Sequence, residues 1–527
     1  MAKRYEGSRA LRKSKTSNPV DFRAGLAAVC VWGVVLLAGC GGSPFTPTSS
    51  VTATNNALVA RYMVPTPVGA SVYVEFDPTT SYGFQTSSQP APTTGGTTTI
   101  LVAGMKQNTT YHMRAVVTNA DGSINYDEDH TFTTGTVEPA QLPNVQVSTT
   151  SGQTPAPGIE LACLNGGTSS QFQLVAYDPE GNLIWYYNYS PNQGIPNPAK
   201  LLPNGHMVIV LTSYSGGSPV ALGDFQEIDL AGNVIRQFSV VNLNEWIAAA
   251  GFSNVINSIN HDIEALPNGD LLFIASETRP FNNLPGYPGQ TFVTGSDIVE
   301  VNSNNQVVWI WSAFDHLDVN RHPMNFPDWT HANALVFSPS DGNLLFSLRH
   351  QNWVFKIDYQ NGKGSGNILW RVGYQGDFTL NSTNPADWCY AQHDATFLSK
   401  NTAGTFVLGV FDNGNDRVMD TNGDLCGTSG FPACYSRSAI FNVDETNMTA
   451  DLAWAYTLPY SYWGGVTQLL PNGNVYIDVT TPNSEDNAEV LQVTQTATPQ
   501  TIWQMAITGQ TSYRTINLPS LYPGVQW

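Results

Sequence analysis

The sequence is short of positive charge. Its 527 residues include only 22 lysines and arginines, against 41 aspartates and glutamates. Seven of the basic residues and two of the acidic residues lie within the first 39 positions, so the rest of the chain has 15 basic and 39 acidic side chains and a net charge of −24. A surface of this sign repels phosphate backbones, which excludes nucleic acid as a partner.

Long apolar runs and helical periodicity are also scarce. The apolar stretch at residues 24–39 is too short for a comfortable membrane span and follows a basic N-terminus, which is typical of an export signal. It ends in Leu37-Ala38-Gly39-Cys40, which resembles a bacterial lipobox. We therefore expect cleavage after residue 39 and a lipid on Cys40 that contacts a membrane. Gly41 implies, by the same resemblance, the periplasmic face of an outer membrane.

Cysteine is rare: of the six cysteines, Cys30 lies in the export signal and Cys40 is the expected lipid site. Cys426 and Cys434 flank a glycine-rich loop of seven residues. Because disulfides persist outside the cytoplasm, we expect a local disulfide between them. Cys163 and Cys389 are left as free thiols or as a second pair.

Turn-forming residues are abundant instead, with 46 glycines and 33 prolines. Pro-Asn-Gly or a related turn recurs about every 65 residues, at residues 202–205, 266–269, 338–342, 400–404 and 470–473. A second mark, an apolar strand followed by a turn and an aromatic residue, recurs at residues 177–185, 228–238, 301–309, 357–370, 443–454 and 493–503. Six such units of short strands predict an all-β fold, a six-bladed β-propeller over residues 138–527.

A linker at residues 40–54 leads to a separate first domain at residues 55–137. This segment alternates apolar and polar residues between turn signals, which predicts a small β-sandwich. Its run from Asn108 to Val116 resembles a fibronectin type III domain, with Tyr111 in the tyrosine-corner position. We expect this domain to act as a spacer from the membrane, and a homodimer contact or carbohydrate binding stays open.

One position of the repeat is occupied by histidine in three consecutive units. Counting back eight residues from each turn glycine, or eleven where the turn is longer, gives Gly158, Asn197, His261, His331, His393 and Gly465. In a propeller, equivalent positions surround one central channel. The three histidines are therefore expected to meet there.

The neighbours of His331 point to anion chemistry. Asn333 is two residues away, so both side chains are expected on one strand face. If the hairpin turns near Ser340, paired residue numbers sum to about 680, which places Arg349 opposite His331. The planar guanidinium donates parallel hydrogen bonds to a tetrahedral oxyanion and is a poor neighbour for a bare metal ion.

These motifs resemble the bacterial arylsulfotransferase family, the nucleotide-independent aryl-sulfate sulfotransferases, over roughly residues 140–527. The matching pieces are residues 260–263, 328–333, 347–351 and 392–395. The resemblance implies that aryl sulfates are donors, that phenols are acceptors and that no cofactor is needed. It also implies that His393 is transiently sulfated, that His331 is general acid and base, and that three residues hold the sulfuryl oxygens: Arg349, His261 and Asn333.

Other candidates are weaker. Aromatic residues near these motifs could stack on an aryl ring, namely Trp329, Trp388, Tyr390, Tyr462 and Trp463. Residues 411–417, which follow the His393 strand, could line the substrate mouth or bind calcium together with Asp420 and Asp424. No role is assigned to the remaining histidines near the repeat, His206, His316, His322 and His350.

Two other functions stay open. Three imidazoles with an open position also describe many zinc hydrolases. Alternatively, the propeller could be a lipid-anchored scaffold that binds anions without catalysis. We expect no metal, because Arg349 belongs to the same cluster.

Overall fold

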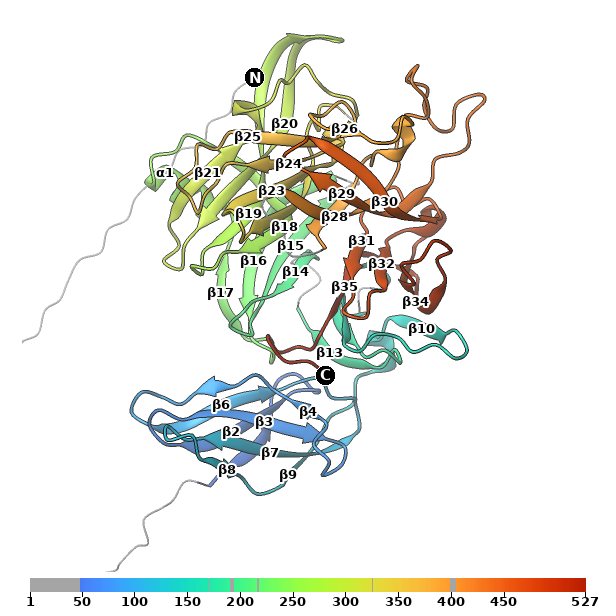
Figure 1. The fold of residues 1–527 in the computed structure, drawn as a ribbon. Coiled ribbons are helices and arrows are strands. Elements are labelled where there is room, and N and C mark those ends of the chain that lie inside the picture. Colours follow the sequence, from blue (N-terminus) through green and yellow to red (C-terminus); the bar gives the residue numbers. More distant parts are fainter. Residues whose placement is uncertain (1–47, 169, 190–193, 216–217, 325, 399–403) are drawn as a thin grey trace, which may run out of the picture. The chain divides into compact units, whose positions relative to one another are not determined.

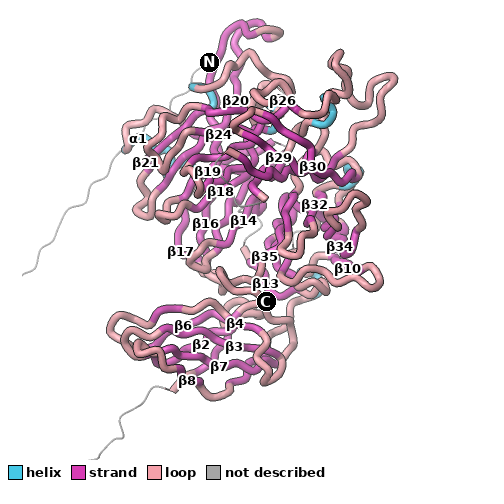
Figure 2. Tube along the Cα trace, viewed as in Figure 1, coloured by secondary structure: helices cyan, strands magenta, loops and turns pink. Residues whose placement is uncertain are grey.

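The computed structural model describes residues 48–168, 170–189, 194–215, 218–324, 326–398 and 404–527, and these are mostly β-strands (Figures 1 and 2). The export signal and Cys40 lie outside this part. No helix within it is long and apolar enough to cross a membrane. The longest is α1 (Val240–Ala249), whose N-cap Ser239 forms a capping box with Asn242.

The N-terminal β domain consists of two sheets. One contains β1 (Ser50–Ala53), β2 (Ala60–Thr66) and β6 (Gly96–Val102). The other contains β3 (Ser71–Asp77), β4 (Phe84–Gln85), β5 (Gln89–Pro90), β7 (Thr110–Thr118), β8 (Ile124–Tyr126) and β9 (His130–Thr133). Alternate residues of β2 and β3 are buried, as the alternating sequence predicts. The Tyr111 hydroxyl accepts the backbone N–H of Lys106 at 2.9 Å, the hydrogen bond of a tyrosine corner.

Six further sheets, each of four or five mostly antiparallel strands, form the rest. The first two contain β14 (Ile195–Leu201), β15 (Met207–Ser215), β16 (Ser218–Ile228) and β17 (Val234–Phe238), then β18 (Ile256–Ala265), β19 (Leu271–Leu284), β20 (Tyr287–Val301) and β21 (Val307–Ser312). The next two contain β22 (Ala332–Ser338), β23 (Asn343–Leu348), β24 (Trp353–Ile357) and β25 (Ile368–Gly373), then β27 (His393–Phe397), β28 (Thr405–Asp412), β29 (Ser436–Asp444), β30 (Thr449–Leu458) and the short β26 (Thr379–Leu380).

The last two sheets are completed by strands from the two ends of this region. One contains β31 (Val466–Leu469), β32 (Val475–Val479), β33 (Asn487–Val493), β34 (Thr501–Thr508) and β10 (Asn144–Thr149). The other contains β35 (Gln510–Leu518), β11 (Ile159–Gly166), β12 (Leu174–Tyr177) and β13 (Leu183–Tyr187). The chain is therefore closed twice, where β10 pairs with β34 and where β35 pairs with β11.

One edge strand from each sheet contacts its counterparts in a closed cycle. The order is β14, β18, β22, β27, β31, β35 and back to β14. This cycle is consistent with a β-propeller and puts the first residues of these strands near a common axis.

Four of the five repeated turns join the first two strands of their sheets, as the sequence predicts, whereas the turn expected at residues 400–404 lies outside the described residues except for Gly404. Gly205, Gly269 and Gly473 have φ angles of 85°, 88° and 83°, a left-handed conformation that favours glycine. The predicted hairpin register is also confirmed, because Ala332 pairs with Leu348 and the Arg349 N–H donates to the His331 carbonyl at 3.2 Å.

Two details of the repeat differ from expectation. Gly158 does not occupy the sixth ring position, because it precedes β11, an inner strand of its sheet, and the edge strand there is the C-terminal β35. Strand alternation also does not govern His331 and Asn333. His331 precedes β22 with a φ of 49°, and the register shifts between Ala332 and Ala334.

Candidate active site

The three ring histidines lie where the edge strands are irregular. His261 lies in a register shift between Ile259 and Ile263 of β18, and its φ is 61°. His393 begins β27, just before a shift that ends at Thr396. A register shift releases a residue from the ladder and turns its side chain, so these irregularities free the imidazoles from ordinary strand alternation.

The strand that completes the cycle contributes Tyr513, which the sequence analysis missed. The rings of His261 and His331 are 4.8 Å apart. The Tyr513 hydroxyl oxygen lies 3.1 Å from His261 Nδ1, and the centroid of the Tyr513 ring is 6.3 Å from that of the His393 ring. Tyr513 thus links two of the histidines, and only the closure of the ring by β35, not a sequence motif, puts it there.

His393 is held in one tautomer by Asn413, which lies just after β28. The Asn413 Nδ2 donates to two backbone carbonyls, those of Ser461 and Gly464, at 2.7 and 3.0 Å. Its Oδ1 must therefore face His393 Nδ1, 2.7 Å away, and accept a proton from it. Burial, reinforced by the charge of Arg349, lowers the pKa of His393 well below its ordinary value. The ring is neutral, and Nε2 keeps a free lone pair.

Arg349 is a buried cation with unused donor capacity. Its Nη2 donates to the Tyr462 carbonyl at 2.8 Å, and its Nη1 lies 2.5 Å from His350 Nε2. The buried Nε has no hydrogen-bond partner among the described residues. Burial lowers the pKa of Arg349 from its ordinary value, although the group stays charged. A buried, incompletely bonded guanidinium of this kind suits an anion.

Asn333 is completely buried and faces the next strand of the cycle. Its Nδ2 donates to the Gln392 carbonyl at 2.7 Å, directly before His393. Its Oδ1 has no hydrogen-bond partner among the described residues, and a second Nδ2 hydrogen remains for a ligand. The side chain therefore connects the strands that carry His331 and His393.

A buried ionic cluster lies behind the histidines and explains the two His-Asp pairs of the sequence. Arg514, from β35, donates to Asp262 at 3.2 Å and to the Asn333 carbonyl at 3.0 Å, and it lies 3.6 Å from Asp394. Lys200 of β14 approaches Asp262 at 2.8 Å. Burial opposes the charge of Arg514, but the two carboxylates outweigh it and raise its pKa. Each His-Asp pair thus offers an imidazole to the centre and a carboxylate to Arg514.

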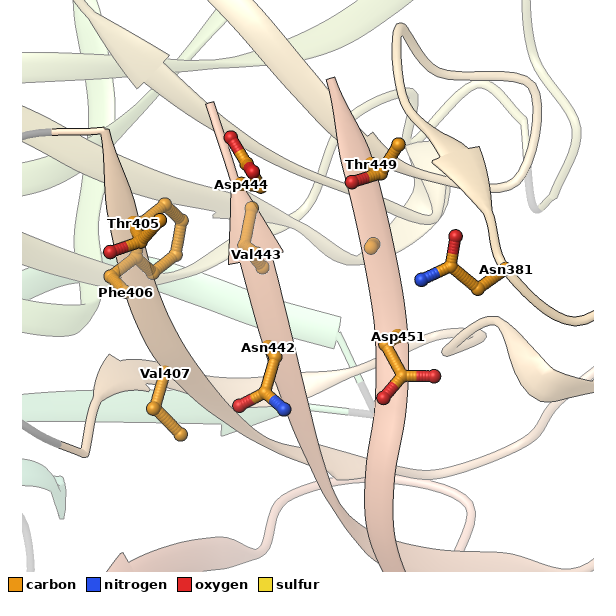
Figure 3. Close-up of a pocket in the computed structure, with 10 residues that line it drawn as sticks. Asn381, Thr405, Phe406, Val407, Asn442, Val443, Asp444, Thr449 and Asp451 are labelled. Carbon is orange, nitrogen blue, oxygen red and sulfur yellow. The ribbon is translucent and has the colours of Figure 1, made fainter. Parts of the chain in front are cut away.

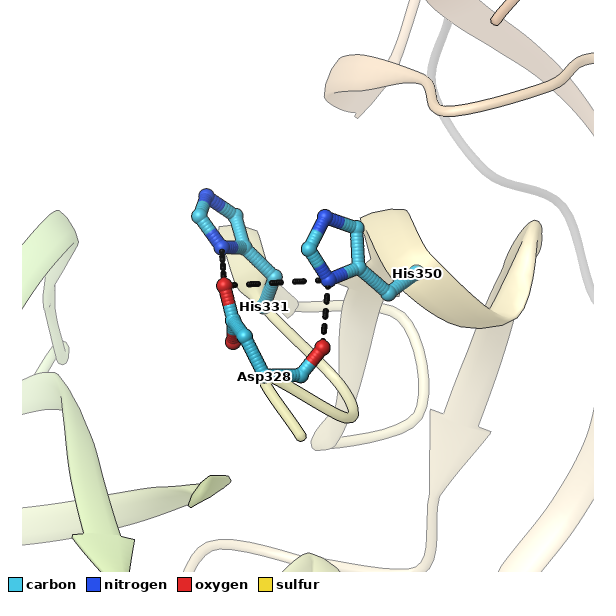
Figure 4. A group of neighbouring side chains, drawn as sticks. All are labelled: Asp328, His331 and His350. Carbon is cyan, nitrogen blue, oxygen red and sulfur yellow. Dashed lines mark hydrogen bonds and ion pairs between the residues drawn. The ribbon is translucent and has the colours of Figure 1, made fainter. Parts of the chain in front are cut away.

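Asp328 and His350 form a small cluster with His331 (Figure 4). His331 Nδ1 lies 2.6 Å from Asp328 Oδ2, and His350 Nδ1 donates to the Asp328 carbonyl at 2.6 Å. Partial burial acts to raise the pKa of Asp328, but His331 and His350 hold it well below its ordinary value. The three residues have ligand atoms within 4.8 Å of one another. Arg349 beside His350 nevertheless makes this a poor site for a cation.

The structure separates the five aromatic candidates into two groups. Trp329, Trp388 and Tyr390 are at most 6% exposed and pack in hydrophobic cores, so they have no free face for an aryl ring. Tyr462 is 44% exposed, and Trp463 stacks on Tyr513 with centroids 6.3 Å apart. Only this second group lies beside the histidines with accessible surface.

The predicted disulfide between Cys426 and Cys434 is confirmed. Cys163 and Cys389 are buried free thiols, and burial raises the pKa of each to about 12. In the loop considered for calcium, the Asp420 carboxylate accepts hydrogen bonds from Asn422 and from the Asp424 backbone, as in an ordinary turn.

The other histidines without an assigned role lie in ordinary structural settings. His206 pairs with Glu227, and His316 stacks on Trp311. His322 packs against Tyr287 and Phe326. His350 is the exception, because it contacts Arg349 and Asp328.

A separate hollow lies across β28, β29 and β30 (Figure 3). None of the ring histidines lines it, and its side chains are mostly small or polar: Asn381, Thr405, Phe406, Val407, Asn442, Val443, Asp444, Thr449, Ala450 and Asp451. It offers no nucleophile beside a general acid, so the histidine centre is the better candidate site.

Fold and candidate site together define a protein of ring-arranged β-sheets with a histidine–arginine centre suited to a tetrahedral oxyanion. The chain belongs to the arylsulfotransferase (ASST) family, whose model matches residues 146–514. Arylsulfate sulfotransferases AssT from Lelliottia amnigena and Escherichia coli O6:H1 are each 26% identical to it over 165 residues. That stretch covers 27% of this chain and 25% of each relative, about a quarter of the relatives' length.

Similarity to solved structures is weak. A protein of unknown function from Bacteroides caccae has 12% identity and a TM-score of 0.35, over 68% of this chain and 94% of that chain. Kuenenia stuttgartiensis hydrazine synthase has 15% identity and a TM-score of 0.25, over 49% of this chain and 71% of that chain. At these scores, neither structure adds to the assignment.

Proposed function

We propose that this protein transfers a sulfuryl group from an aryl sulfate to a phenol through a sulfated His393. The transfer takes place in a six-bladed propeller spanning residues 138–527. The single observation that carries the proposal is the fixed ring of His393. Asn413 occupies its Nδ1, burial keeps it neutral, and Nε2 is left as a nucleophile beside a buried guanidinium.

In the first half-reaction, His393 Nε2 attacks the sulfur of the ester. The N–S bond forms as the bond between sulfur and the aryl oxygen breaks. Protonated His331 gives its proton to the departing phenolate, which leaves as a phenol. Arg349, His261 and Asn333 stabilise the sulfuryl oxygens as charge develops on them, and each such donor is typically worth about 2.7 to 4 kcal/mol.

In the second half-reaction, an acceptor phenol takes the sulfuryl group. Neutral His331 removes the phenol proton as the phenol oxygen attacks sulfur and the N–S bond breaks. His393 returns to its neutral form and His331 to its protonated form, so both are ready for another donor. No nucleotide and no metal enters either step.

The aryl groups of donor and acceptor are proposed to bind against Trp463, Tyr513 and Tyr462. These side chains form a partly exposed aromatic edge next to His261 and His393. Aromatic faces stack on planar rings and contribute about 0.5 to 1.5 kcal/mol beyond buried area. The other three aromatic candidates support the fold instead.

We also propose that residues 1–39 are removed, that Cys40 is lipidated and that the protein faces the periplasm at the outer membrane. The linker expected at residues 40–54 would then end before β1 (Ser50–Ala53), which pairs with β2. Residues 55–137 would belong to a fibronectin type III-like spacer that could also form a homodimer contact. Radiolabelled palmitate incorporated into the wild type and not into Cys40→Ser would support the anchor. Equal labelling of both would refute it.

The test of the function is intact-mass analysis of protein lacking residues 1–40, mixed with p-nitrophenyl sulfate. We expect one added sulfuryl group, mapped to His393 and removed by phenol, and no adduct in His393→Ala. His316→Ala is the matched control because His316 stacks on Trp311 away from the centre. Phenol-independent release of nitrophenol would indicate a sulfatase, and an absence of adduct and turnover would favour a binding propeller.

A further inference from the structure

The tautomer of His350 follows from its neighbours. Every N–H of arginine is a donor, so His350 Nε2, 2.5 Å from Arg349 Nη1, must accept and carry no proton. The proton is then on Nδ1, which donates to the Asp328 carbonyl at 2.6 Å. Burial, followed by the neighbouring His331, lowers the pKa of His350 to about 3. His350 is thus a neutral acceptor for Arg349.

Asp328 fixes the second ring in the same way. Its Oδ2 accepts from His331 Nδ1 at 2.6 Å and lies 3.7 Å from His350 Nδ1 (Figure 4). With Nδ1 engaged, the free nitrogen of His331 is Nε2. A carboxylate in this position also stabilises the protonated imidazole, as in catalytic triads.

We propose that Asp328 and His350 are a positioning pair for sulfuryl transfer. Asp328 holds the tautomer of His331 and stabilises its protonated form, while His350 holds the Arg349 guanidinium in the orientation that binds sulfuryl oxygens. Neither residue touches the substrate. The inference rests on the proposed function, because that function gives His331 and Arg349 their roles.

The charged groups around His331 identify Asp328 as the partner of its protonated form. The titratable and charged groups that face it are Asp328, His350, His261, Arg349 and His393. Asp328 is the one anion in this set. Its loss therefore removes the one negative charge that favours protonated His331 over the neutral form.

The first experiment compares Asp328→Asn with the wild type in each half-reaction. We expect transfer to fall on the order of 10- to 100-fold, the usual effect of losing an orienting partner. Neutral His331 is the form that accepts the phenol proton, and without Asp328 the neutral form persists to lower pH. The acid limb of kcat/KM for the acceptor should therefore move to lower pH. Phenyl sulfate should lose more rate than p-nitrophenyl sulfate, because its leaving group needs a proton more.

The matched control is Asp358→Asn, in an exposed turn between β24 and β25. It should leave rates and pH limbs at wild-type values. Asp328→Glu restores the charge and should bring the limb back toward its wild-type position. An Asp328→Asn profile that overlays the wild type would overturn the role of Asp328.

His350 is tested by two replacements that differ in acceptor capacity. His350→Leu removes the acceptor for Arg349 and should slow His393 sulfation without moving the pH limb. His350→Gln supplies an amide oxygen and should recover part of the rate. Equal rates for His350→Leu and the wild type would refute the role of His350.

A further measurement needs no variant, so it stands even if the replacements fail to fold. Nitrogen-15 chemical shifts of the histidine rings should show Nδ1 protonated and Nε2 unprotonated in His350, and Nδ1 protonated in His331 in both its protonated and its neutral form. An Nε2-protonated His350 would overturn the proposal. If the wild type forms no His393 adduct, the proposed function fails, whereas an active wild type with unaffected variants refutes only the positioning pair.

Discussion

At the residue scale, several buried acids make the stability of the folded protein depend on pH. Burial raises the pKa of Asp478 to about 8, against hydrogen bonds from Thr515 and Ser512 that lower it. It also raises the pKa of Glu160 to about 7. At a pH between its ordinary pKa and this raised value, each carboxyl is mostly protonated in the folded protein and ionised in the unfolded chain. Their contribution to stability is present below their unfolded pKa values and is lost as pH rises through about 7 and 8.

The histidines act in the opposite direction over a different range. Burial lowers the pKa of His261 and His393 below 6.5, so they reduce stability only as pH falls below that value. Between pH 6.5 and 8 the acids therefore dominate, and the free energy of unfolding should fall by about 1.4 kcal/mol per pH unit for each group still protonated. Urea unfolding of Asp478→Asn should show a flatter profile there, and Asp358→Asn the wild-type slope. A wild-type profile that is level from pH 6.5 to 8 would contradict this.

Replacement of Arg514 should disturb several buried contacts at once. It bonds to Asp262 and to the Asn333 carbonyl, and it lies beside Asp394, so Arg514→Gln leaves buried carboxylates without their cation. We expect a loss of about 3 to 5 kcal/mol in unfolding free energy, measured by urea titration. The control is Arg371→Gln, which breaks a partly exposed pair with Asp377 and should cost at most about 1 kcal/mol. Equal losses in the two variants would count against the buried cluster.

The histidines and Arg349 were predictable because they follow a repeat and a hairpin register. Tyr513 and Arg514 were not, since β35 has no repeated turn and belongs to the sixth sheet only through ring closure. The contacts of Asn413 and His350 were not predicted, because their partners are set by loop and 3-10 geometry. Alternation would turn His350 away from Arg349, but η4 (Arg349–Gln351) brings both residues to the same cluster.

At the scale of elements, two glycines that both have a positive φ should lose different amounts of stability when alanine replaces them. Gly465 precedes β31 with a φ of 106°, and an added Cβ would lie 2.4 Å from the Phe411 ring. Gly473 has a φ of 83° with nothing within 4 Å. Gly473→Ala should cost about 1 to 2 kcal/mol, from the left-handed backbone alone. Gly465→Ala should cost about 1 to 3 kcal/mol more, as overpacking does. Thermal unfolding of both variants measures the difference, and equal midpoints would refute the steric argument.

The disulfide closes a loop with a sequence separation of 8. Replacing Cys426 and Cys434 by serine should lower unfolding free energy by about 2 to 3 kcal/mol, because the unfolded chain regains loop entropy. Cys163→Ser is the control for thiol loss without a crosslink. Mild reductant should destabilise the wild type and leave the double variant unchanged, and destabilisation of both would point to another cause.

At the scale of the whole molecule, closure depends on the last strand. A chain ending at Thr508 lacks β35, so β11 keeps β12 but loses its other partner, and the ring contacts to β14 and β31 disappear. We expect this truncation to be degraded by protease under conditions where the intact chain resists. Removal of residues 1–47 takes away no described strand and should preserve resistance. A protease-resistant chain ending at Thr508 would contradict the role of β35 in closure.

Closure of the ring by β35 also determines when, during synthesis, the candidate active site is first complete. Synthesis proceeds from the N-terminus, and sheets can form as their strands emerge, but Tyr513 and Arg514 belong to the final strand. Until β35 has been synthesised, the centre lacks both Tyr513, which links two of the histidines, and Arg514, the cation of the buried cluster behind them. Products that end before residue 513 therefore lack both side chains, and the centre is completed in one step when β35 pairs with β11.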